Sequence, residues 1–197
     1  SITDNDTAGV TISQSGGSTN VTEGTPTDTY TVVLDRGPTV SVTVSVTSTT
    51  QASGAPITLT FTTSNWNVAQ TVSVTAVDDL VVEGTHTTAL AHTVTTSDAF
   101  YSTVTIAGVT ASITDNDTAG VTISQSGGTT NVTEGTTTDT YTVVLDRGPT
   151  VSVTVSVSST AQASGAPITL TFTTSNWNVA QTVTVTAVDD LVVEGTH

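Results

Sequence analysis

Apolar and polar residues alternate along most of this chain with a period of two. Val40, Val42, Val44 and Val46 are separated by serine and threonine, which gives a strand one apolar face and one face of hydroxyls. The same pattern predicts strands at 10–14, 29–35, 57–62, 70–77, 87–96 and 108–114, with the turn signals "SGGST", "DRGPT", "ASGAP" and "DDLVVEG" between them. Helical spacing is absent, and threonine, valine and serine suit strands. We therefore predict an all-β fold, an immunoglobulin-like antiparallel β-sandwich of about seven strands.

The chain repeats itself. Residues 1–86 match residues 112–197 at a constant offset of 111, and only five positions differ. This predicts tandem sandwiches cut from a longer array: the end of one repeat at 1–6, a complete repeat at 7–117, and a second repeat at 118–197. The second repeat is expected to be truncated, lacking the counterparts of 87–117 with the last two strands. We expect continuing sequence, or strands of a neighbouring molecule, to complete it.

Charge and composition narrow the function. The net charge is −15, with two arginines and no lysine, so nucleic acid and anionic membrane surfaces are poor partners. No cysteine is present to form a disulfide or a thiolate metal site, and no stretch approaches the ~18 to 20 apolar residues of a membrane-spanning helix. The three histidines show no ligand spacing, and no serine is singled out as a nucleophile. We expect no catalytic residues and no enzyme.

Most of the acidic residues fall in three short motifs, "NVTEG", "TAVDDLVVEG" and "SITDND", each of which occurs twice in the chain. The first motif lies in a turn before a predicted strand, the second in the loop that follows one, and the third at the end of the last strand of the repeat. In the first copy they supply Glu23, Asp78, Asp79, Glu83, Asp115, Asn116 and Asp117. In the second copy they supply Glu134, Asp189, Asp190 and Glu194, and the chain opens on a further triplet that contains Asp4 and Asp6.

If the three loops meet at one end of the sandwich, six carboxylates and one amide converge in the first copy. Such a cluster repels itself unless a cation neutralises it, and calcium, with six to eight oxygen ligands, fits this donor set better than zinc. The alternative is that each acid only caps a turn or solubilises a loop. We predict bound Ca²⁺. In the second copy the site would be incomplete, and Asp4 and Asp6 of another molecule could close it.

The segment "VSVTAVDDLVVEG", followed by an alternating strand and a closing "ITDND", resembles the Calx-β domain family. The resemblance covers the first repeat and the visible part of the second. It implies a seven-stranded sandwich that binds calcium at loops near its C-terminal end, with ligands at Glu23, Asp78, Asp79, Glu83 and the triplet 115–117. Asn116 stands where calcium-sensing members tend to have a third Asp, which favours the weaker affinity of extracellular modules, about 10⁻⁴ to 10⁻³ M.

Three functions remain open at this stage. The first is a calcium-binding structural module that acts as a rigid spacer in a long secreted or cell-surface adhesin, filament or exoprotein. The second is a calcium-sensing regulatory domain, and the third is a carbohydrate-binding accessory module, for which Trp66 and Trp177 are stacking candidates. Near-identity of the repeats favours the spacer, because reach grows with the number of copies. The expected partners are neighbouring repeats, including head-to-tail self-association, and the expected location is extracellular.

Overall fold

The computed structural model of the protein describes residues 4–24, 27–193 and 195. They form two compact units. The first holds Ser1–Asp79 and Gly84–Asn116, and the second holds Leu80–Glu83 and Asp117–His197. The acidic triplet 115–117 therefore contains a unit boundary, and the tetrapeptide 80–83 of the first repeat belongs by its contacts to the second unit.

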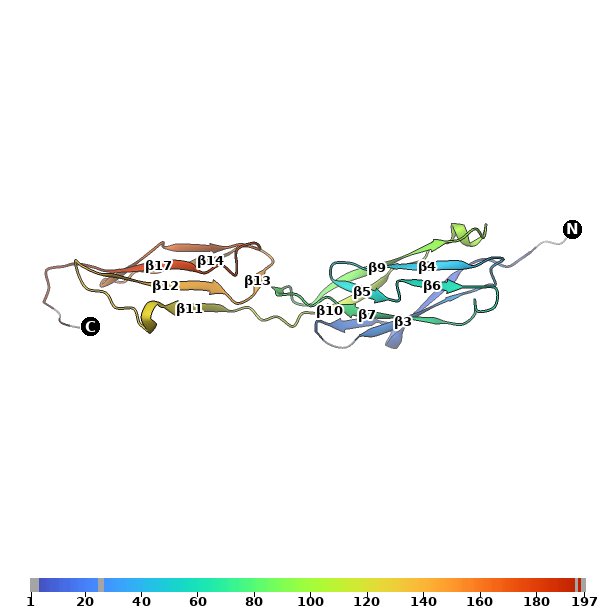
Figure 1. The fold of residues 1–197 in the computed structure, drawn as a ribbon, viewed down its shortest axis with the longest axis horizontal. Helices are drawn as coiled ribbons and strands as arrows, with labels where there is room; N and C mark the ends of the chain where they lie inside the picture. The colour runs from blue at the N-terminus through green and yellow to red at the C-terminus, as the bar shows by residue number, and fades with distance from the viewer. Residues whose placement is uncertain (1–3, 25–26, 194, 196–197) are drawn as a thin grey trace. The chain divides into compact units, whose positions relative to one another are not determined.

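The first unit is a sandwich of two sheets (Figure 1). Short turns, among them the 3₁₀ segments Ser15–Gly17 and Tyr101–Thr103, connect the strands. One sheet has the order β1 (Val10–Gln14), β3 (Asp28–Leu34), β7 (Gln70–Ala76) and β5 (Ala52–Ala55). The other has the order β2 (Thr19–Thr22), β10 (Val109–Thr114), β9 (His86–Thr95), β4 (Val42–Thr47) and β6 (Thr58–Phe61). The all-β sandwich class is confirmed, with β2 and β5 as short strands beyond the seven predicted.

The predicted alternation sets the core of this unit. In β4 the side chains of Val42, Val44 and Val46 are buried while the intervening hydroxyls lie toward the outside. Tyr30, Val32 and the other inward residues of the facing sheet pack against them. Since side chains on a strand point alternately to opposite faces, one period-two stripe per strand is enough to fill the space between the sheets.

The "ASGAP" segment corrects one prediction. It was predicted as a turn, but Ala52–Ala55 is strand β5 and pairs antiparallel with β7. A Cβ added at Gly54 would lie 2.8 Å from Val46 Cγ1 and 3.1 Å from Leu90 Cδ2. Glycine is required at this position because the backbone approaches the core closely. In the sequence, a glycine required for close approach looks the same as a glycine required for a turn.

The second unit repeats the first sheet and part of the second (Figure 1). A four-stranded sheet has the order β11 (Val121–Gln125), β12 (Thr138–Leu145), β17 (Gln181–Ala187) and β15 (Ala163–Ala166). β14 (Val153–Ser156) pairs with β16 (Thr169–Phe172), and β13 (Gly148–Pro149) pairs with β8 (Val81–Val82).

The core of the second unit is smaller. Val143, Leu145, Leu170, Phe172 and Val183 are its buried members among the described residues. Val153 and Val155 are only half-buried, whereas their counterparts Val42 and Val44 are fully covered. β4 lies between β6 and β9, and the printed sequence contains no second copy of β9. Among the described residues, no helix has the length and apolar character needed to span a membrane.

Candidate metal centre

The pairing of β2 with β10 places the first two acids side by side. These strands run parallel, with Val21 opposite Ile113 and Thr22 opposite Thr114. The next backbone step is held as well, because the Glu23 amide donates to the Thr114 carbonyl oxygen at 3.1 Å. Parallel strands end at the same edge of a sheet, so Glu23 and Asp115 emerge together.

Glu23 is the centre of the cluster and is fully buried, with an exposed fraction of 0%. One of its carboxylate oxygens lies within 4.8 Å of an Asp115 oxygen, and one lies within 4.8 Å of a ring nitrogen of His86. The backbone between 84 and 86 joins these groups: His86 Nδ1 donates to the Gly84 carbonyl at 3.0 Å, and the Gly84 amide donates to Asp115 Oδ2 at 2.8 Å. A carboxylate is seldom buried without a cation or hydrogen-bond donors that compensate for its lost hydration. The buried carboxylate of Glu23 is therefore a position where a bound cation would be stabilising.

Asp78 and Asn116 adjoin the same turn. Asn116 Nδ2 donates to the Glu23 carbonyl oxygen at 3.0 Å and to Asp78 Oδ1 at 3.2 Å. Gly24 has φ +66°, and a Cβ there would lie 3.3 Å from Asp78 Oδ2. The Glu-Gly turn therefore packs against the first acid of the "DD" pair, and Asp79 follows it, half-buried. Asn116 joins the cluster as a hydrogen-bond donor; its role as an oxygen ligand stays a prediction.

Glu83 and Asp117 belong to the second unit, although each is bonded along the chain to a residue of the first unit, Gly84 and Asn116. Within the second unit, Arg147 Nε donates to Asp117 Oδ1. The Asp117 side chain is almost fully buried there, at 4% exposed. Glu83 is half-buried. Their binding of calcium stays a prediction.

The acids of the second repeat show part of the same arrangement. Gly135, with φ +67°, presents its Cβ position 3.3 Å from Asp189 Oδ2, which repeats the contact of Gly24 with Asp78. Glu134 is half-buried rather than buried, and 130–133 forms only an isolated bridge where the first unit has β2. Asp190 Oδ1 accepts a hydrogen bond from the Val192 amide at 2.7 Å. Glu194 lies outside the described residues.

Asp4 and Asp6 are exposed and held by other contacts. The Asp6 carboxylate is 2.6 Å from Arg36 Nε, and the Asp6 amide donates to Asp4 Oδ1 at 3.0 Å. The Asp6–Arg36 pair corresponds to Asp117–Arg147 at the offset of 111. The third residue of each triplet thus pairs with the equivalent arginine in its own unit, a pairing that the sequence analysis missed.

The donor set in the first unit fits a hard divalent cation. Glu23, Asp78 and Asp115 offer carboxylate oxygens, and calcium takes six to eight oxygens in flexible geometry with water filling open positions. His86 is the functional candidate that sequence reasoning passed over. The signal available was its place two residues after the Glu-Gly turn, at the start of β9.

Other buried titratable groups have structural partners. Tyr30 Oη and His92 Nε2 are 2.8 Å apart, and His92 Nδ1 donates to the Ala107 carbonyl at 3.1 Å; when the ring is neutral, Nε2 accepts and Tyr30 is the donor. Burial raises the pKa of Tyr30 to about 12 and lowers the pKa of His92. The indole of Trp66 packs against the core, with Nε1 3.3 Å from the Cβ position of Gly37. These contacts explain the positions of Tyr30, His92 and Trp66 as parts of the packed fold, with no bound ligand needed.

Neither a protein-family model nor a curated protein matches the chain. Among solved structures it is similar to the crystal structure of CBD12 from CALX1.2, with 18% identity over 92% of this chain and 76% of that one, at a TM-score of 0.38. It is also similar to the crystal structure of the calcium-binding domain CBD12 of CALX1.1, with 17% identity, coverages of 92% and 77%, and a TM-score of 0.36. At these scores the fold assignment rests on the sheet order described above.

Proposed function

We propose that the first unit is a calcium-binding module and that the chain serves as a rigid spacer in a long secreted or cell-surface protein. The observation that carries the calcium site is the buried carboxylate of Glu23 beside Asp115, with Asp78 joined to the same turn through Asn116. The first unit contains one arginine and no lysine, and that arginine, Arg36, is bonded to Asp6. A divalent cation is the counter-charge that such a group of oxygens favours.

The spacer role is supported by the repeat. The triplet 115–117 belongs to the metal motifs and also contains the unit boundary, so an ion that orders this triplet would restrict the chain where one unit leads into the next. Extracellular fluid holds millimolar calcium, which matches the modest affinity expected of a site with an asparagine in place of a third aspartate. A sensing role and a carbohydrate-binding role remain the alternatives, and the packed indole of Trp66 weighs against the latter.

Calorimetric titration of the chain with CaCl₂ tests the site. Glu23→Gln keeps the volume of the side chain and removes its charge, so we expect binding to weaken at least about tenfold. Asp35→Asn is the matched control, since Asp35 is exposed and accepts its hydrogen bond from Thr11 away from the cluster. Equal binding by Glu23→Gln and the wild type would refute the site.

Small-angle scattering tests the spacer. Calcium should narrow the distribution of distances across the two-unit chain, and EDTA should broaden it. If the protein binds calcium by calorimetry but neither calcium nor EDTA changes the distribution of distances, the spacer function is refuted and the calcium-binding function stands.

A further inference from the structure

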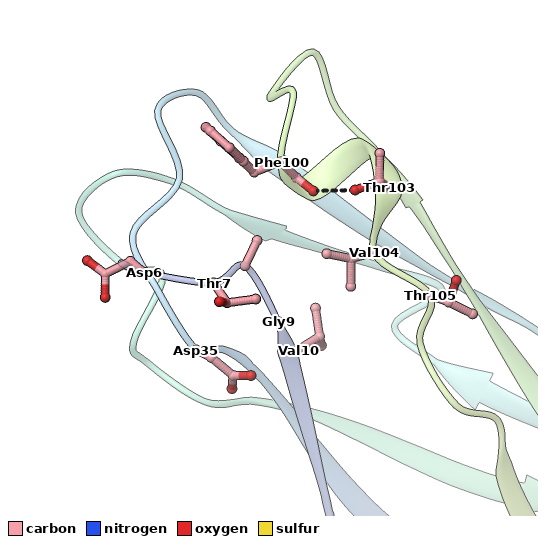
Figure 2. A pocket seen from close by; sticks show the side chains of 10 residues that line it. Asp6, Thr7, Gly9, Val10, Asp35, Phe100, Thr103, Val104 and Thr105 are labelled. Atoms are coloured by element: carbon pink, nitrogen blue, oxygen red, sulfur yellow. Dashed lines mark hydrogen bonds between the residues drawn. The ribbon is translucent and has the colours of Figure 1, made fainter. Parts of the chain in front are cut away.

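The first unit contains a cavity of about 500 Å³ (Figure 2). One wall is the stretch 6–10 together with Asp35, and the other is Phe100 with residues 103–105. Among the described residues, the lining includes no member of the cluster around Glu23. The volume is within the range of cavities that bind small molecules, so the chemistry of the two walls decides what could bind.

Phe100 lies in the connection between β9 and β10, and its ring is 68% exposed. The amides of Phe100 and Tyr101 donate to Asp98 Oδ1 at 3.0 and 3.1 Å. Tyr101 is buried, and its Oη donates to the Arg36 carbonyl oxygen at 2.6 Å. Thr103 Oγ1 donates to the Phe100 carbonyl oxygen at 2.9 Å, the dashed line in Figure 2. The backbone on both sides of the ring is therefore fixed, so little conformational freedom would be lost when a ligand packs on it.

The opposite wall is also held by hydrogen bonds. The Asp35 amide donates to the Gly9 carbonyl oxygen at 3.0 Å, and Thr11 Oγ1 donates to Asp35 Oδ1 at 2.6 Å. The carboxylate lies so close to Gly9 that a Cβ there would collide with Asp35 Oδ2. Asp35 is nevertheless exposed, so its carboxylate lines the cavity in an orientation that Thr11 fixes. A carboxylate in this position can accept hydrogen bonds from the hydroxyl groups of a ligand.

The charges around the cavity favour a neutral ligand. The lining contains two carboxylates, those of Asp6 and Asp35. Asp6 Oδ1 is 2.6 Å from Arg36 Nε, so one of the two charges already has a counter-charge. An anionic ligand would be repelled by both carboxylates, and a cationic ligand would have to compete with Arg36 for Asp6. A neutral polar ligand meets neither penalty.

Most of the other lining groups are hydroxyls and aliphatic side chains. Thr7, Thr103 and Thr105 supply hydroxyl groups, and Val10 and Val104 supply methyl groups. A pyranose ring matches this composition, because its hydroxyls donate and accept hydrogen bonds while its C–H bonds form apolar patches that pack on an aromatic ring. Ligand sites generally combine an apolar surface with a few placed polar groups, and this cavity has both.

We propose that this cavity binds one neutral hexose unit of a polysaccharide, with the Phe100 ring packed against the sugar ring and the Asp35 carboxylate accepting hydrogen bonds from its hydroxyls. The site shares no residue with the cluster around Glu23, so it does not rest on the proposed calcium function. It also differs from the stacking sites considered from the sequence, because the indole of Trp66 packs against the core.

Affinity electrophoresis in native gels tests the proposal, with EDTA present and one neutral polysaccharide in each gel: a β-glucan, a mannan or a galactan. At least one of the three should retard the wild type. Phe100→Ala should weaken that binding at least about tenfold, while Phe100→Trp should retain it. Ile57→Ala is the matched control, since Ile57 is 62% exposed in the same unit and lies outside the cavity. The variants should melt as the wild type does, because both positions are exposed.

Calorimetric titration with an oligosaccharide of the polysaccharide that binds makes the test specific for this cavity. The chain contains one Phe100 but two equivalent tryptophans, Trp66 and Trp177, so we expect one site per chain. Two sites per chain, or binding that Phe100→Ala leaves unchanged, would overturn the proposal. So would a wild type that none of the three neutral polysaccharides retards, or one that binds only cationic chitosan oligomers. Binding that requires calcium and disappears in Glu23→Gln would assign the sugar to the calcium site and would overturn the proposal as well.

Discussion

Replacing Asp98 by alanine should destabilise the first unit by about 3 kcal/mol. The Asp98 side chain is 2% exposed and accepts four hydrogen bonds: from the amide and hydroxyl of Thr39 at 2.8 and 2.7 Å, and from the amides of Phe100 and Tyr101 at 3.0 and 3.1 Å. Each bond to a charged acceptor contributes roughly 1.5 to 3 kcal/mol, and bonds that share one carboxylate do not add fully. Asp98→Asn keeps an acceptor oxygen and should cost less, about 2 kcal/mol.

The pKa of Asp98 gives a second estimate of the same contribution. These hydrogen bonds, the Thr39 amide first, lower the pKa from 3.8 to about 2. A carboxyl whose pKa is depressed in the folded state stabilises the fold above its unfolded value, and that stabilisation disappears as the pH falls through the folded value. The difference corresponds to about 2 kcal/mol, lost between about pH 4 and pH 2. The gap between wild type and Asp98→Ala should shrink by this amount over that interval.

Urea unfolding followed by tryptophan fluorescence measures the effect. In a Trp177→Phe background the signal comes from Trp66, which packs against the core of the first unit. Asp35→Ala is the control, because Asp35 is exposed and accepts one side-chain bond, from Thr11 at 2.6 Å; it should cost less than about 1 kcal/mol. An Asp98→Ala protein within 1 kcal/mol of the wild type, or with unchanged pH dependence, would refute the reasoning.

Two further changes test other parts of the fold. Burial lowers the pKa of His92 below 6.5 in the folded state, so the unfolded chain takes up a proton at this residue first as the pH falls. The free energy of unfolding should therefore decrease as the pH drops below about 6.5. His92→Gln should make the melting temperature depend less on pH between about pH 6.5 and 5, and an unchanged dependence would contradict this. Gly54→Ala should cost about 1 to 3 kcal/mol, since its Cβ would meet Val46 and Leu90 in a closed core. Gly165→Ala should lower the free energy of unfolding less than Gly54→Ala does, because the Val157 that its Cβ meets is half-buried and can turn outward. If denaturant unfolding shows equal losses for the two variants, β9 is not what closes the core around Gly54.

The sequence by itself determined the repeat, seven of the strands in the first unit and most of the turns. Alternation such as Val42, Val44 and Val46 needs only the geometry of an extended backbone, and the Glu-Gly turns need a residue that adopts positive φ, as Gly24 and Gly84 do. Both are local properties that neighbouring residues fix. The grouping of acids at strand ends was visible in the same way, as were the "DD" pairs and the triplets.

Tertiary structure decided which of these local features meet. Asn116 reaches the Glu23 carbonyl across 93 positions of sequence because β2 and β10 pair in parallel with one particular register. That same edge brought in His86, which no local pattern marked as a partner of Glu23. Gly54 was predicted as a turn residue since only the packed core reveals the close approach of Leu90. Strand pairing and loop contacts depend on the free energy of burying distant segments together, and that free energy is not encoded in any one window of the chain.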